Sequence, residues 1–104
     1  MATAMPIPIL IDCDPGHDDA IAILLALANP ERLDVLGITT VGGNQALDKI
    51  TDNALKLLSF VGRDVPVAKG AKGPILGELR TGEEAHGDSG MDGPVLPPSR
   101  FAPL

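Results

Sequence analysis

The chain has 104 residues, a formal net charge of −6 and a hydrophobic fraction of 44%. This length suffices for one small domain with a modest core, and the apolar content is typical of a folded protein. The acidic balance, without any basic cluster, argues against nucleic acid or an anionic membrane as the main partner. Cys13 is the single cysteine, so no internal disulfide can form. Because the sequence shows no signal peptide and no apolar run of membrane length, we expect a soluble, cytoplasmic protein.

The hydrophobic pattern predicts alternating strands and helices, and therefore an α/β fold. Apolar, β-branched runs predict strands, and apolar residues at intervals of three and four predict helices. In chain order these elements are a strand over 7–11, a helix over 18–29, a strand over 33–41, a helix over about 46–61 and a strand over 65–68. Two right-handed βαβ units would build an open, mainly parallel, Rossmann-like sheet.

Apolar residues at helical spacing mark both predicted helices. The first helix carries Ile21, Leu24, Leu25 and Ala28, and the second carries Leu47, Ile50, Ala54, Leu57, Leu58 and Val61 on one face. Gly62 is the expected C-cap of the second helix, since glycine readily adopts the left-handed conformation that ends many helices.

The character of the sequence changes after residue 68. The segment 69–104 is rich in glycine and proline and shows little sustained periodicity, and its part 81–93 is predicted to be a loop. Three strands and two helices are few for a parallel sheet. We therefore interpret residues 1–104 as the N-terminal part of a single larger domain, with a βαβαβ core in 1–68 and a loop and tail in 69–104.

Four aspartates lie within eight positions where the first predicted strand ends, namely Asp12, Asp14, Asp18 and Asp19. Ligands of open α/β sheets bind at the carboxyl ends of the strands. Four carboxylates gathered there would repel one another unless a cation lay among them, and Ca²⁺ takes oxygen ligands of this kind. In the alternative interpretation, Asp14 or Asp18 caps the helix and the other acids complement its dipole.

A second polar group, Gly42-Gly43-Asn44, follows the second predicted strand at the same edge. Asn44 by itself is also a favoured helix N-cap, and this role is compatible with ligand contact. The two glycines are too weak a signal for a phosphate-binding loop, because no GxGxxG or Walker pattern follows. Cys13 is interpreted as a packed small side chain rather than a nucleophile.

Three segments together resemble the inosine–uridine-preferring nucleoside hydrolase family. The segment 12–23 is similar to the N-terminal signature of that family, 38–44 to its next motif, and 86–91 to a third. The resemblance implies that Asp14 and Asp19 bind Ca²⁺. It further implies that Asp18 is the general base acting on a metal-bound water, with Asp12 as a supporting acid beside the metal.

The resemblance also implies the substrate contacts and the reaction. Asn44 would contact the ribose, and His86 would lie near the base on a loop over the site. The implied reaction is hydrolysis of the N-glycosidic bond of a small ribonucleoside to ribose and free base, as in purine or pyrimidine salvage. The resemblance also implies that complete members of the family form dimers or tetramers. Family members are several times longer, so we expect this chain to supply only the N-terminal half of the site and to be inactive alone.

Two other interpretations stay open at this point. A strand that ends in Asp-x-Asp, here Asp12 and Asp14, also begins Mg²⁺-dependent phosphatases of the haloacid-dehalogenase kind. Those proteins have no use for Asp18 and Asp19, and Ca²⁺ would inhibit rather than support them. Alternatively, the chain is an inactive truncated remnant or a binding module, which its exposed apolar surface would make prone to self-association.

Overall fold

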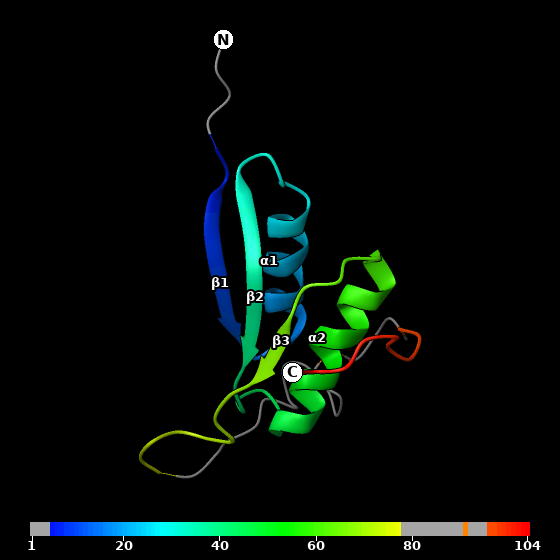
Figure 1. Cartoon of the computed structure of the whole chain (residues 1–104). Coiled ribbons are helices and arrows are strands. Elements are labelled where there is room, and N and C mark those ends of the chain that lie inside the picture. The colour runs from blue at the N-terminus through cyan, green and yellow to red at the C-terminus, as the bar shows by residue number, and fades with distance from the viewer. Residues whose placement is uncertain (1–4, 78–90, 92–95) are drawn as a thin grey trace.

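The computed structural model describes residues 5–77, 91 and 96–104, and within these residues it contains three strands and two helices (Figure 1). In chain order they are β1 (Ile7–Cys13), α1 (His17–Leu27), β2 (Leu33–Thr40), α2 (Leu47–Val61) and β3 (Val67–Lys69). The predicted α/β class and the order of the five elements are confirmed. No helix in the described residues is long and apolar enough to cross a membrane.

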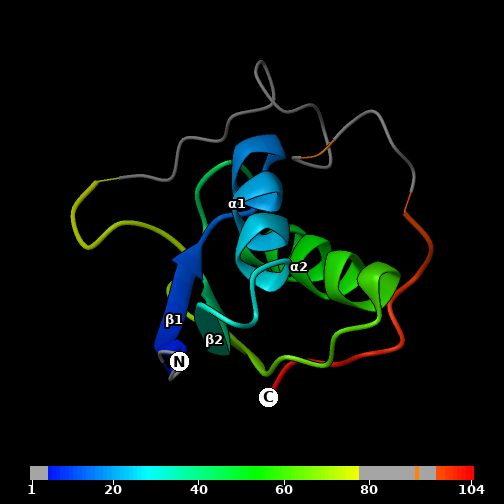
Figure 2. The same ribbon diagram turned by 90° about the horizontal axis from the view of Figure 1, so that it is seen from above.

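The three strands form one parallel sheet in the order β1-β2-β3, with β2 in the centre. Ile38 of β2 lies opposite Ile11 on one side and opposite Val67 on the other. Right-handed βαβ units that add strands in one direction place their helices on one face. Figure 2 shows α1 and α2 on the same side of the sheet. All three strands therefore end at one edge, and both helices cover one face.

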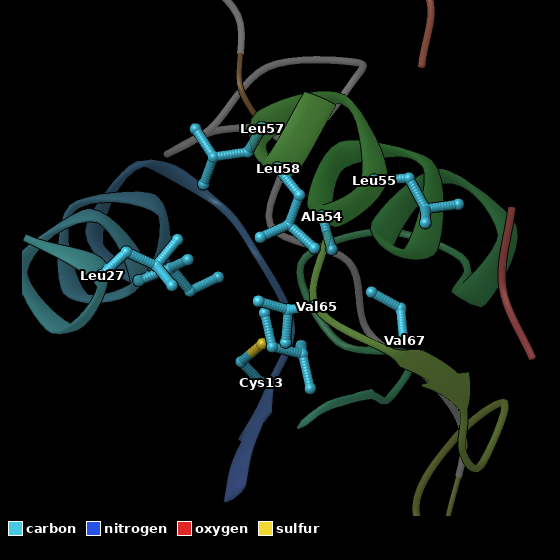
Figure 3. Close-up of a cluster of buried hydrophobic side chains, with 10 residues drawn as sticks. Cys13, Leu27, Ala54, Leu55, Leu57, Leu58, Val65 and Val67 are labelled. Carbon is cyan, nitrogen blue, oxygen red and sulfur yellow. The ribbon is translucent and has the colours of Figure 1, made fainter. Parts of the chain in front are cut away.

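The hydrophobic core lies between this face and the two helices (Figure 3). Strand residues meet residues of α1, of α2 and of the chain entering β3: Cys13, Ile23, Leu27, Ile38, Ala54, Leu55, Leu57, Leu58, Val65 and Val67. Burial of such side chains contributes roughly 1.5–3 kcal/mol each for the larger ones. Of the residues expected on the apolar face of α2, all except Val61 are buried.

Helix α1 buries a different set of residues from the one its spacing singles out. Ile21 and Leu25 are 67% and 64% exposed, whereas Ile23, Ala26 and Leu27 are buried. The prediction of a helix here is confirmed, but its spacing did not identify the face that packs. The reason is that α1 is apolar on almost every side, so several faces satisfy the same periodicity.

The last nine residues return to pack against α2 and β3. Leu96 and Phe101 contact the core, and the amide of Leu104 donates to the carbonyl of Val67 at 2.8 Å. The hydroxyl of Ser99 donates to the carbonyl of Leu55 at 3.1 Å. Most of the predicted loop 81–93, including His86, lies outside the described residues.

Candidate metal centre and active-site edge

The end of β1, the first turn of α1 and the loop after β2 meet at the carboxyl edge of the sheet. This follows from the parallel topology, which brings successive strand ends to one side. Pro15 and Gly16 are buried and form the turn into α1, and Gly16 is its N-cap, without a capping side chain. The interpretation of Asp14 or Asp18 as a helix cap is therefore wrong.

Asn44 holds Asp14 at two points. Its backbone amide donates to Oδ2 of Asp14 at 3.0 Å, and its side-chain Nδ2 donates to the backbone carbonyl of Asp14 at 2.7 Å. Helix α2 takes Ala46 as its N-cap, again without a capping side chain, so Asn44 does not cap that helix. These contacts join loops that are 30 residues apart in the sequence.

Asp19 completes the contact between the first two segments. The backbone amide of Asp14 donates to Oδ2 of Asp19 at 3.0 Å. Burial raises the pKa of Asp19 above its ordinary value, and the neighbouring carboxylates of Asp14 and Asp18 raise it further, although the amide hydrogen bond opposes them. Asp14 therefore lies close enough to Asp19 to disfavour the charged form of Asp19.

Paired carboxylates of this kind are suited to a hard cation such as Ca²⁺. A bound cation would offset the repulsion that the fold imposes on Asp14 and Asp19. Within the described part of the chain, no three His, Cys, Asp or Glu side chains converge on a common point. Since Ca²⁺ takes roughly six to eight oxygen ligands, the pair fits one part of its coordination shell.

Asp12 and Asp18 lie beside this pair in different surroundings. Asp12 is exposed and lies opposite Thr39 in the sheet register, and the hydroxyl of Thr39 donates to its Oδ1 at 2.7 Å. Asp18 is exposed in the first turn of α1, next to Asp19. The structure thus brings both Asp19 and Asn44 into direct contact with Asp14, whereas Asp12 contacts Thr39.

Cys13 is 7% exposed and belongs to the core. Burial and the nearby charges of Asp19, Asp12 and Asp14 raise the pKa of its thiol to about 12. A thiol with this pKa stays protonated at neutral pH, and thiols in that form are neither nucleophiles nor metal ligands. This confirms the interpretation of Cys13 as a packed side chain.

Comparisons with known proteins identify the family of the chain. The model of the family described as inosine-uridine preferring nucleoside hydrolase matches residues 9–103. The chain belongs to this family. The pyrimidine-specific ribonucleoside hydrolases RihA of Citrobacter koseri and Escherichia coli are each 56% identical to it over 100 residues. These alignments cover 95% of this chain but 32% of each relative, so the chain spans about a third of their length.

Solved nucleoside hydrolases show the same fold. The plant enzyme PpNRh1 superposes with a TM-score of 0.81 at 43% identity, over 95% of this chain and 32% of that one. A purine-preferring ribonucleoside hydrolase from Gardnerella vaginalis superposes with a TM-score of 0.85 at 29% identity, over 94% and 32% of the two chains. Membership in this family excludes the haloacid-dehalogenase interpretation of Asp12 and Asp14.

The roles of two residues at this candidate site were missed in the sequence analysis. Buried Asn53 of α2 donates from Nδ2 to the carbonyl of Pro15 at 3.2 Å and so ties α2 to the turn before α1. A Cβ at Gly43 would collide with the carboxylate of Asp14. In the sequence, Gly42-Gly43 was interpreted only as too weak a signal for a phosphate-binding loop. The close approach of Gly43 to Asp14 becomes visible in the structure.

Proposed function

We propose that this chain supplies the N-terminal part of an active site that hydrolyses the N-glycosidic bond of ribonucleosides to ribose and free base. Family membership supports the reaction class. The observation that carries the proposal is the contact between Asp14 and Asp19 at the carboxyl edge of the sheet, with Asn44 fastened to Asp14. In this proposal residues 1–68 form the core that presents the site and 69–104 supply the loop and tail beside it.

Asp14 and Asp19 are the residues that we assign to a Ca²⁺ ion. Their carboxylates are hard oxygen donors, and Asp19 lies partly buried beside the carboxylates of Asp14 and Asp18, which supports the assignment. When bound, the ion would lower the pKa of a water molecule and orient that water and the ribose hydroxyls. Further oxygen ligands would come from parts of the fold outside this chain.

The remaining polar residues are assigned by their positions around this pair. Asp18, exposed beside Asp19, is the general base that accepts a proton from the attacking water. Nδ2 of Asn44 donates to the carbonyl of Asp14, so the side-chain oxygen of Asn44 is the atom that we assign to accept a hydrogen bond from a ribose hydroxyl. Asp12, held by Thr39, contributes negative charge near an oxocarbenium-like transition state. His86 is assigned to the base-binding side by its motif alone.

The relatives suggest both pyrimidine and purine nucleosides as substrates. Two of the most similar relatives are named as pyrimidine-specific, and one of the structural neighbours is named as purine-preferring. We therefore propose ribonucleosides as the substrate class, and assays with uridine and inosine determine which nucleobase is preferred. A role in nucleoside salvage and assembly into dimers or tetramers belong to the same proposal for the complete protein.

The test is a chimera in which residues 1–104 replace the matching segment of Escherichia coli RihA. We expect this chimera to release ribose from uridine or inosine in the presence of Ca²⁺. The substitution Asp18→Asn should lower turnover by about 10²–10⁴-fold, the usual contribution of a general base, without loss of Ca²⁺ affinity. The matched control is Asp52→Asn, which removes an exposed acid of α2 paired with Lys56.

Two outcomes would contradict the proposal. Turnover of the Asp18→Asn chimera within a few-fold of the unsubstituted one would assign the base elsewhere. A folded chimera that releases no ribose from either nucleoside would overturn the assignment of the site itself.

A further inference from the structure

We propose that Gly43 is a positioning residue for the Asp14 carboxylate, an inference that rests on the proposed role of Asp14 as a metal ligand. The loop after β2 passes so close to Asp14 that a side chain at position 43 has no room. A Cβ built on Gly43 would lie 2.9 Å from Cγ and 3.1 Å from Cβ of Asp14, and it would overlap Oδ2. The carboxylate thus rests directly against the backbone of Gly43.

This close approach lets the next residue fasten Asp14. With no side chain in the way, the backbone amide of Asn44 reaches Oδ2 of Asp14 at 3.0 Å, and Nδ2 of Asn44 reaches the carbonyl of Asp14 at 2.7 Å. The backbone and one carboxylate oxygen are both held, so the second oxygen has a fixed direction. A carboxylate ordered during folding loses little further conformational entropy when a cation binds.

Space, rather than backbone conformation, explains the glycine at position 43. Among the described residues, the glycines with positive φ are Gly62 and Gly77. Gly43 therefore does not need the left-handed conformation that favours glycine, and the collision with Asp14 is what excludes a side chain. The need for glycine at position 43 therefore arises from the Asp14 carboxylate, because that is the group that a methyl at position 43 would displace.

Gly42 provides the contrast that separates this role from ordinary loop packing. A Cβ on Gly42 would lie 2.8 Å from the carbonyl carbon of Lys72, and the amide of Gly42 donates to Ala71 at 2.9 Å. Its close neighbour is backbone, which cannot rotate away. The neighbour of Gly43 is a side chain, which can. An added methyl should therefore strain the loop at position 42 and turn the Asp14 carboxylate at position 43.

The first test is a calorimetric Ca²⁺ titration of the metal-free RihA chimera described above, with Gly43→Ala and Gly42→Ala as a matched pair. Outer contacts to metal ligands typically change affinity 10–100-fold, so we expect Gly43→Ala to weaken Ca²⁺ binding at least about tenfold. We expect Gly42→Ala to lower the unfolding temperature but to keep the Ca²⁺ affinity within about twofold. Equal Ca²⁺ affinities for the Gly43→Ala and unsubstituted chimeras would overturn the proposal, as would equal losses in the two variants.

The second test needs no metal and uses a double-mutant cycle on the stability of the chain. If Gly43→Ala acts through the carboxylate, its cost should shrink when Asp14→Ala removes that carboxylate. Costs that simply add would show that the two residues do not interact and would overturn the inference. This test also separates the two proposals. An unsubstituted chimera that binds no Ca²⁺ contradicts the metal role of Asp14, and the cycle then decides whether Gly43 and Asp14 interact.

Discussion

The two helices, of 11 and 15 residues, pack on the same face of the sheet, but they differ in which side chains they bury. Helix α2 has a clear apolar face, and Ile50, Ala54 and Leu58 on that face are completely buried. Helix α1 is apolar on most sides, and Ile21 and Leu25 remain largely exposed. The difference shows that hydrophobic content alone does not define a core face, since burial also depends on which neighbours are present.

The exposed side of α1 borders an apolar groove toward α2. The groove has a volume of about 430 Å³, and its lining includes Ile21 and Leu24 of α1 with Phe60 and Val61 of α2. Helix α2 thus borders the filled hydrophobic core on one side and this open apolar groove on the other. We conclude that α2 mainly stabilises the fold, whereas α1 carries its apolar flank at the surface.

The acids in the first turns of the two helices show a parallel contrast. The exposed carboxylate of Asp48 in α2 accepts a hydrogen bond from Nζ of Lys69 at 2.8 Å, which lowers its pKa. Asp19 in α1 is partly buried beside Asp14, and its pKa is raised. Both positions benefit from the helix dipole, so burial and nearby acids at Asp19 and the lysine beside Asp48 cause the opposite pKa shifts. Asp48 of α2 forms an ordinary surface ion pair with Lys69, whereas Asp19 of α1 belongs to the candidate site.

The largest effect is expected from removing a core side chain of α2. Leu58 is completely buried, so Leu58→Ala should lower the free energy of unfolding by about 2–5 kcal/mol. Leu25→Ala makes the same chemical change on the exposed flank of α1 and should stay within about 0.5 kcal/mol. Urea unfolding followed by circular dichroism measures both. Similar losses in the two variants would show that the flank of α1 is covered in solution.

A smaller effect of opposite sign is expected at Asp19. Its raised pKa means that the folded chain disfavours the charged form, so Asp19 contributes stability below its ordinary pKa of 3.8 and loses it as pH rises through the raised value. Asp19→Asn removes this charge and keeps an oxygen to accept the amide of Asp14. We expect it to stabilise the metal-free chain at pH 7 by less than about 1 kcal/mol, because solvent screens a partly exposed group.

Thermal unfolding between pH 4 and pH 7, in the presence of a chelator, tests the prediction for Asp19. The unsubstituted chain should become less stable relative to Asp19→Asn as the pH rises. A variant that is less stable than the unsubstituted chain at pH 7 would show that the carboxylate pair is favourable even without a cation.

The smallest effect is expected at the surface pair of α2. Asp48 has a lowered pKa, so its contribution to stability is present above the ordinary pKa of 3.8 and is lost as pH falls through the lowered value. Asp48→Asn should therefore slightly lower the thermal midpoint at pH 7, and 1 M salt should remove the difference. Asp34→Asn, at an exposed acid of β2, is the control. A loss at Asp48 that persists in high salt would contradict a simple ion pair.

Much of this architecture can be read from local sequence patterns. The amphipathic spacing of α2 identified its buried face, and Gly62 was recognised as its C-cap, which the structure confirms with a φ of 72°. The order of strands and helices predicted a parallel sheet whose ends share one edge, and this placed Asp14 and Asn44 on the same side of the molecule. These features depend on residues only a few positions apart, so the sequence displays them directly.

Other features depend on contacts between distant segments. The buried face of α1 is set by the sheet and by α2, the hold of Asn44 on Asp14 joins residues 30 positions apart, and the need for glycine at position 43 arises from the same approach. Local periodicity cannot predict such contacts, because they form only when the parallel strands bring the loops together. The sequence therefore indicated which residues gather at the edge, and the packed fold determined how they touch.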